Sequence, residues 1–134
     1  MEELDVSGFD TSVVTDMTAM FMACLSIRSV DAENFDTSQV TSMSAMFCDC
    51  QEMVEAIVNN FYTGNVTDMS VMFANCYVLM YLDVSGFDTG NVTRMQEMFY
   101  NCSELTELDI SGFDMSNVTD RSGMFEGCAC CPMS

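Results

Sequence analysis

The side chains in this sequence that could do chemistry are eight cysteines and 21 aspartates and glutamates, within 134 residues. Histidine and lysine are absent, so a nucleophile or general base would have to be a thiol or a carboxylate. Thiols can form disulfides or bind soft metals, whereas carboxylates can bind calcium or a basic partner. The spacing of these residues decides which of these sites the chain can build.

Five of the cysteines recur at a constant interval of 26 residues: Cys24, Cys50, Cys76, Cys102 and Cys128. We interpret this series as a structural ladder of small core side chains, because free cysteine is among the most often buried residues. Disulfides between neighbouring coils are the alternative, since coils stacked about 4.8 Å apart bring Cα atoms within bridging range. Parallel stacking points the thiols in the same direction, so we expect at most one or two bridges.

Three further cysteines, Cys48, Cys130 and Cys131, lie outside this series and favour a local bridge near the C-terminus. A soft metal could be held by Cys48-x-Cys50 or by the run that starts at Cys128, but neither has the C-x-x-C spacing of a zinc knuckle. Because no histidine could complete such a site, we expect no metal and no cofactor.

Carboxylates recur with the same period in two neighbouring columns. The columns are Asp5, Asp31, Ile57, Asp83, Asp109 and Glu3, Ser29, Glu55, Tyr81, Glu107. Stacked carboxylates about 5 Å apart repel by about 0.8 kcal/mol in water, and calcium or a basic partner would relieve this repulsion. The plain alternative is a solvated acidic face. We expect a partner-binding strip that consists of Glu3, Asp5, Asp31, Glu55, Tyr81, Asp83, Glu107 and Asp109.

Two more polar series are interpreted as structural. The first is Asp10, Asp36, Asp88 and Asp114, whose side chains are expected to accept bonds from their own backbone in turns. The second is Asn65, Asn91 and Asn117 in N-V-T, with Asn101 in N-C-S. These triplets match N-glycosylation acceptors, but we expect the asparagines to cap turns.

A repeat of 26 residues positions all of these columns. Its clearest marker is a phenylalanine series without insertion or deletion: Phe9, Phe35, Phe61, Phe87 and Phe113. We therefore treat residues 1–134 as one repeat domain. Its five coils are 1–26, 27–52, 53–78, 79–104 and 105–130, followed by a tail at 131–134.

Each coil is expected to contain one short parallel strand and one short helix, which makes the fold an α/β solenoid. The predicted strands lie near 3–6, 29–32, 55–58, 81–84 and 107–110. Val14, Met17, Met20 and Cys24 have the three- and four-residue spacing of a helical face, and the threonine after the valine could cap it. Wide helices opposite narrow strands would make the sheet concave.

The phenylalanine and methionine columns are expected to form the core. Coil 5 has Arg121 where the other coils have Met17, Met43, Met69 and Met95. Because a terminal coil has an open face from which a long charged side chain can reach water, we expect Arg121 to mark the end of the stack.

The segment from Leu82 to Leu105 reads LDVSGFDTGNVTRMQEMFYNCSEL. With its LD-[VI]-SGFD element, N-V-T triplet and MFxxC element, it resembles the BspA-like leucine-rich repeat family of bacterial surface proteins, and the resemblance covers all five coils. The resemblance implies a leucine-rich-repeat-like solenoid on a cell surface or secreted, with adhesive roles and no catalytic residues. Coil 3 departs from the pattern, because residues 53–64 lack the LD-x-SGFD element.

The charge balance excludes several partners. A formal net charge of −18 repels nucleic acid and anionic membranes, while basic proteins, cations and neutral glycans remain open. No apolar run has the roughly 18 residues of a membrane span, so no membrane insertion is expected. The opening residues, MEELDVSGFD, lack the basic and apolar regions of a signal peptide, so none is expected within this chain.

We expect a non-catalytic interaction or adhesion module that binds a protein or glycan on a host or neighbouring cell. The alternatives are a structural spacer without a specific ligand and an acidic surface that binds calcium weakly. Coils 3 and 4 supply the exceptional residues Ile57, Tyr62, Tyr77 and Tyr81. Exposed aromatic residues gathered on one face would favour binding, and burial of all of them would favour the spacer.

Overall fold

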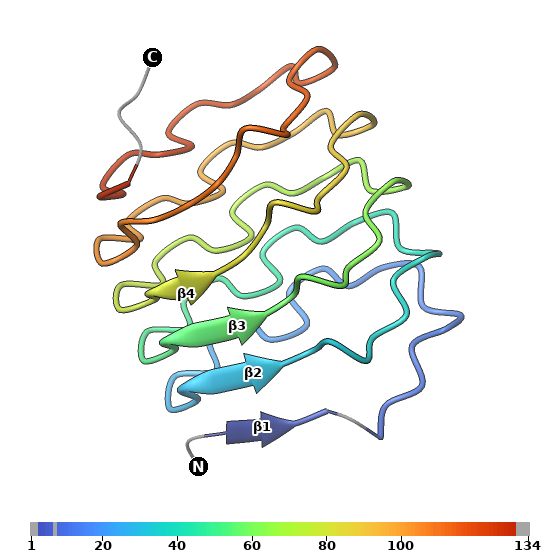
Figure 1. Cartoon of the computed structure of the whole chain (residues 1–134), viewed down its shortest axis with the longest axis vertical. Coiled ribbons are helices and arrows are strands. Elements are labelled where there is room, and N and C mark those ends of the chain that lie inside the picture. Colours follow the sequence, from blue (N-terminus) through green and yellow to red (C-terminus); the bar gives the residue numbers. More distant parts are fainter. Residues whose placement is uncertain (1–2, 7, 131–134) are drawn as a thin grey trace.

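The computed structural model describes residues 3–6 and 8–130, of which residues 3–5 are described by their backbone alone. The chain winds into a stack of similar coils, with the N-terminal coil at one end of the stack and the C-terminal coil at the other (Figure 1). A four-stranded parallel sheet runs along one side, in the order β1-β2-β3-β4. Its strands are β1 (Glu3–Asp5), β2 (Ser29–Asp31), β3 (Glu55–Ile57) and β4 (Tyr81–Leu82).

The register of the sheet follows the sequence repeat. Leu4 pairs with Val30, Val30 with Ala56, and Ala56 with Leu82. Each step is 26 residues, so one repeat makes one coil, as predicted. The predicted fifth strand is wrong: residues 107–110 form no strand. Within the described residues coil 5 has a neighbour on one side only, and this segment therefore has one possible pairing partner.

The helix prediction is wrong as well, because the described residues contain no helix. The amides of Met17 and Ala19 donate to the carbonyl oxygens of Ser42 and Ser44 in the next coil, at 2.9 Å each. The amide of Met20 bonds back to Met17 at 3.2 Å and closes a turn. Alternate amides thus bond along the stack, where a helix would use all of them within one segment. No helix in the described part of the chain is long and apolar enough to cross a membrane.

The turns depend on two left-handed residues in every coil, with φ between 51° and 76°. The first series is Ala19, Ala45, Val71, Glu97 and Gly123, and the second is Ala23, Asp49, Asn75, Asn101 and Gly127. Glycine, asparagine and aspartate are the residues that most readily adopt this conformation. The second series was therefore a signal against a helix, which the apolar spacing concealed.

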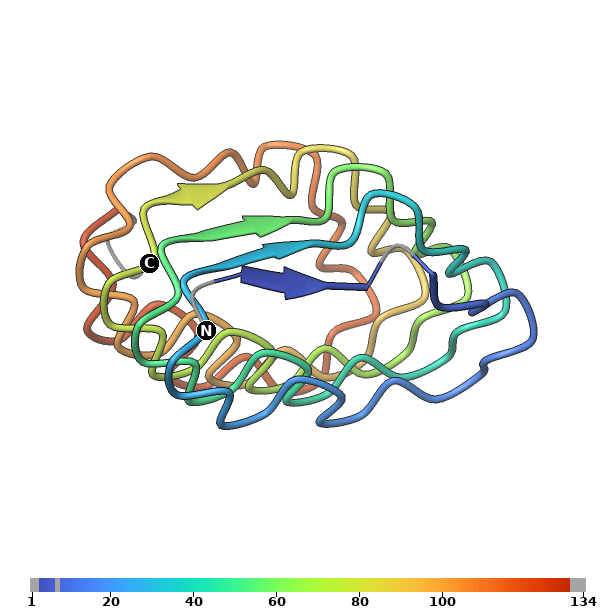
Figure 2. The same ribbon diagram turned by 90° about the horizontal axis from the view of Figure 1, so that it is seen from below.

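The side of the coils opposite the sheet also stacks as extended backbone. Asp16, Ser42, Asp68, Arg94 and Asp120 form successive parallel bridges from coil to coil. Figure 2 shows the coils nested on both sides when the stack is seen from its end. In the part of the chain that the structure describes, no row of wide helices lies opposite the strands, so the basis for the predicted concave sheet is missing.

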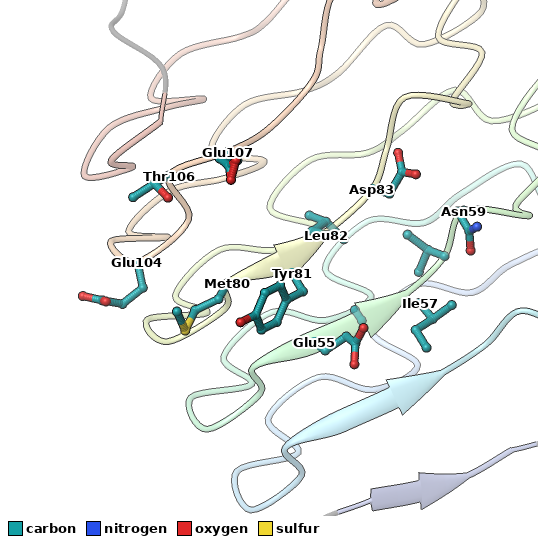
Figure 3. Close-up of a pocket in the computed structure, with 12 residues that line it drawn as sticks. Glu55, Ile57, Asn59, Met80, Tyr81, Leu82, Asp83, Glu104, Thr106 and Glu107 are labelled. Atoms are coloured by element: carbon teal, nitrogen blue, oxygen red, sulfur yellow. The ribbon is translucent and has the colours of Figure 1, made fainter.

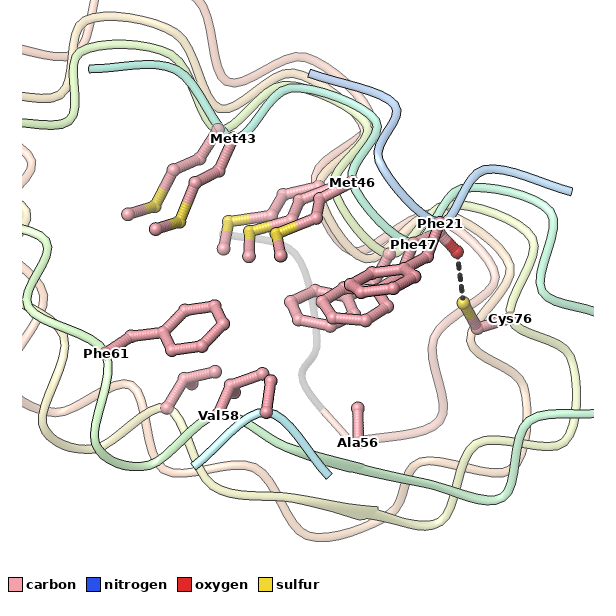
Figure 4. Packing of buried hydrophobic residues seen from close by; sticks show 14 of the residues in the cluster. Phe21, Met43, Met46, Phe47, Ala56, Val58, Phe61 and Cys76 are labelled. Carbon is pink, nitrogen blue, oxygen red and sulfur yellow. Dashed lines mark hydrogen bonds between the residues drawn. The ribbon is translucent and has the colours of Figure 1, made fainter. Parts of the chain in front are cut away.

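Stacked aromatic rings fill the core, as predicted. The rings of Phe35, Phe61 and Phe87 are buried, with centroids 6.4 Å apart. Phe9 continues this row but is 53% exposed, and Phe113 is half-buried. A second row packs beside the methionines in Figure 4, and it consists of Phe21, Phe47, Phe73, Phe99 and Phe125.

A row of buried threonines ties each coil to the next one. The hydroxyl of Thr63 donates to the carbonyl of Asp88 at 3.0 Å and accepts from the amide of the same residue at 2.7 Å. Thr11, Thr37 and Thr89 make the equivalent pairs of bonds. Each hydroxyl thus satisfies two backbone groups that no strand pairs.

Replacing the buried Phe87 by alanine should lower the free energy of unfolding by about 3–5 kcal/mol, the usual cost of deleting a core phenylalanine. The exposed Phe9 is the matched control, and Phe9→Ala should cost less than about 1 kcal/mol. Urea unfolding under reducing conditions measures both values. A loss below about 1 kcal/mol for Phe87→Ala would contradict the buried row.

The left-handed turns and a helix predict opposite changes in stability when Gly127 is substituted. Gly127→Ala should destabilise by about 1–2 kcal/mol, because φ is +76° and the new Cβ would lie 3.2 Å from Asn101 Cα. In a helix the same change would stabilise by about 1 kcal/mol. Glu97→Gly should stabilise relative to the charge control Glu97→Gln. Urea midpoints that move the other way for both sites would refute the paired turns.

Candidate functional site

A groove of about 630 Å³ opens on the outer face of the stack, over β3, β4 and the first residues of coil 5 (Figure 3). Its apolar part includes Ile57, Met80 and the ring of Tyr81. Its charged part consists of Glu55, Asp83, Glu104 and Glu107. Among the described residues no arginine lines the groove, so all of its charged side chains are acidic.

The register of the sheet positions the middle of this groove. Glu55 on β3 and Tyr81 on β4 are Cα partners, so their side chains leave the sheet beside each other. Ala56, the next residue of β3, is buried beneath them. Tyr81 is 59% exposed, whereas the Glu55 side chain is half-buried.

Exposed apolar residues gather where the chain enters β4. Tyr77, Val78, Met80 and Tyr81 are all exposed, and Met80 shows 46% of its surface. One repeat further on, the same places hold Ser103, Glu104, Thr106 and Glu107. The end of coil 3 and the start of coil 4 therefore replace this polar edge by an apolar one. Because these four side chains are exposed, burial does not explain the exchange.

The structure brings only part of the predicted strip together. Glu55, Tyr81, Asp83 and Glu107 line the groove. Asp31 and Asp109 are exposed outside it, and the side chains of Glu3 and Asp5 lie outside the described residues. The strip prediction missed Met80, Glu104 and Thr106, which also line the groove. A signal was present in the sequence, because Val78 and Met80 are apolar where the next repeat has the polar residues Glu104 and Thr106.

Several of the aspartates have a structural role in turns. Asp83 Oδ1 accepts the Ser85 hydroxyl at 2.6 Å and the Ser85 amide at 3.0 Å, and these two bonds lower the pKa of Asp83. Asp109 does the same with Ser111. The predicted turn aspartates, Asp10, Asp36, Asp88 and Asp114, each accept the amide two residues on.

The asparagine side chains hold adjacent coils together. Nδ2 of Asn65 donates to the carbonyl of Ser38 at 2.9 Å, and Nδ2 of Asn91 donates to Gly64 at 2.7 Å. Asn117 makes the equivalent bond to Gly90. The expected turn-capping role is thus a bond between coils.

The thiols lie in the core, away from the groove. Cys50, Cys76 and Cys102 are fully buried and donate to backbone carbonyls at 3.1 Å. Burial raises the pKa of Cys50 to about 12 and that of Cys48 to about 11, which keeps both thiols protonated at neutral pH.

The C-terminal cysteines differ from the buried ones. Cys128 is half-buried, and Cys130 is in a disulfide bond. Cys130, one of the cysteines predicted to form a local bridge near the C-terminus, is thus in a disulfide. Cys131 lies outside the described residues. Among residues 3–6 and 8–130, no group of three or more cysteines, aspartates or glutamates could hold a metal ion.

Comparison with known proteins gives one match. A family model described as "Mycoplasma protein of unknown function, DUF285" matches residues 2–77 and, a second time, residues 53–131. The second match begins about two coils after the first, so the family pattern has the same repeat as this chain. No curated protein and no solved structure matches the chain.

The aspartate turns predict how stability depends on acid. Seven aspartates have a pKa below the usual 3.8 because of bonds from serine or threonine: Asp10, Asp16, Asp36, Asp83, Asp109, Asp114 and Asp120. A folded-state pKa below the unfolded value stabilises the fold above the unfolded pKa, and this contribution is lost as the pH falls through the folded pKa. The urea midpoint should therefore fall below about pH 4.

The measurement needs about 1 M salt, where charges are screened beyond about 3 Å and general repulsion is removed. The control is the double variant Asp83→Asn with Asp109→Asn, whose amide oxygens can accept the same bonds but do not titrate. It should fold at neutral pH and lose less stability in acid. Equal acid sensitivity of variant and wild type would contradict the role of these turns.

Proposed function

We propose that this chain, which belongs to the DUF285 family of Mycoplasma proteins of unknown function, is a non-catalytic interaction module. Its binding surface is the groove over β3, β4 and coil 5, together with the exposed edge of Tyr77, Val78, Met80 and Tyr81. The ligand is a protein or glycan. The observation that carries the proposal is this exposed apolar edge beside a groove.

We further propose that the repeats are of the BspA-like leucine-rich type. The support for this is the LD-[VI]-SGFD, N-V-T and MFxxC elements, together with one parallel strand per coil along most of the stack. Under this proposal the module is displayed on a cell surface or secreted, and its partner belongs to a host or to a neighbouring cell.

A spacer and an enzyme fit the surface less well. A spacer gains nothing from Tyr81 and Met80, because polar residues at the same places support coils 2 and 5. An enzyme would need an activated group, but no thiol lines the groove. The chain also has no histidine or lysine to serve as a base.

The repeat supplies substitutions that its own coils already tolerate. Tyr81→Ser copies Ser29 of coil 2, and Met80→Thr copies Thr106 of coil 5. The control, Tyr62→Asp, copies Asp36 and removes an exposed aromatic residue that does not line the groove. Circular dichroism and urea unfolding should show that all three variants fold.

The binding test is a screen of the purified chain against immobilised matrix proteins and neutral glycans, with and without calcium. At least one of them should bind the wild type, and Tyr81→Ser combined with Met80→Thr should weaken that binding at least tenfold. Tyr62→Asp should change it less than twofold. The proposal fails if nothing binds, or if the groove variant binds as well as the wild type.

A further inference from the structure

We infer that the groove receives the cationic side chain of an arginine or lysine from a polypeptide partner. The charged group lies on the ring of Tyr81, between the carboxylates of Glu55 and Glu107. This inference rests on the proposed interaction function and narrows its partner to a basic peptide segment.

The repeat places the three side chains in one row. Glu55 is the register partner of Tyr81, and Glu107 is the same position one coil further on. Figure 3 shows Glu55 and Glu107 on opposite sides of Tyr81. Glu55 lies on the strand that pairs with the strand of Tyr81, and Glu107, which is not in a strand, lines the same groove from the next coil, so a cation on the tyrosine ring has a carboxylate on each side. The ring face attracts the cation, and each carboxylate can accept a charge-assisted hydrogen bond.

The two carboxylates have no other task in the fold. Within the described part of the chain, neither Glu55 nor Glu107 has a hydrogen bond or an ion pair from its side chain. This distinguishes the row from Tyr62, whose neighbours in the stack, Asp36 and Asp88, use their oxygens in turns. The Tyr62 ring also lies against Gly64.

Charge complementarity favours a cationic side chain over other occupants of the groove. A neutral sugar would bury part of Glu55, Asp83, Glu104 and Glu107 without supplying a counter-charge. An anion would be repelled by the same four groups. A metal ion needs several oxygens at one point, and no group of three or more such ligands occurs in residues 3–6 and 8–130.

A capped peptide of alternating arginine and serine, titrated by calorimetry in about 150 mM salt, tests the inference. The same peptide with citrulline in place of arginine keeps the shape but lacks the charge. The arginine peptide should bind at least tenfold more tightly than the citrulline peptide. Its affinity should fall as salt is raised, because screening weakens the ion pairs.

Two double variants separate the local site from the general charge of the protein. Glu55→Gln with Glu107→Gln removes two charges at the row, and Glu33→Gln with Glu126→Gln removes two exposed charges elsewhere. The first variant and Tyr81→Ser should each weaken arginine-peptide binding at least tenfold, and the second less than twofold. Equal losses in both double variants would overturn the inference.

The experiments distinguish failure of this inference from failure of the proposed interaction function. If a neutral glycan binds and loses affinity with Tyr81→Ser while the arginine peptide does not bind, the inference fails and the interaction function stands. If the citrulline peptide binds as tightly as the arginine peptide, the groove recognises no cation and the inference also fails. If the arginine peptide, the matrix proteins and the glycans all fail to bind, both proposals fall.

Discussion

The fold depends on backbone hydrogen bonds that run from coil to coil on both sides of the stack. The sheet supplies them among the first four coils on one side, and the bridges through Ser42 and Asp68 belong to a series that joins all five coils on the other. An inserted residue would shift both rows at once, which explains why the period is constant. The degenerate coil 3 keeps this geometry by a compensating exchange, since it has Ala56 and Val58 where coil 2 has Val30 and Ala32.

The parts of the fold that the sequence predicted are those that need only periodicity. Residues 26 apart must meet, so the strand register and the stacked phenylalanines followed from the repeat. The helix could not be excluded in this way, because apolar residues three and four apart fit both a helical face and two successive turns. Backbone conformation decides between them, and its signal lay in Asn75, Asn101 and Gly127, which favour positive φ.

Only the part of the candidate site that follows from periodicity was predictable. The repeat placed Glu55 and Tyr81 in one column, and their pairing follows from it. The groove itself was not predictable, because it depends on side-chain size at neighbouring outward positions, including Met80 and Glu104. The role of Asp83 was only half visible, since a column of outward aspartates predicts a charged face but does not reveal that the Asp83 carboxylate also closes a turn.

The acidic columns are interrupted at Ile57 and at Tyr81, and these two side chains differ in how far they are exposed to water. Replacing a carboxylate by an apolar residue relieves repulsion along the stack wherever it occurs, and the half-buried Ile57 between Asp31 and Asp83 needs no further explanation. Tyr81 is different, because serine in coil 2 would relieve the same repulsion without exposing an aromatic ring to water. A stability argument therefore accounts for the absence of a carboxylate at this position but not for the presence of tyrosine. The proposed interaction function accounts for the ring, because a partner would cover it, and the inferred cation is the group that best matches the carboxylates of Glu55 and Glu107.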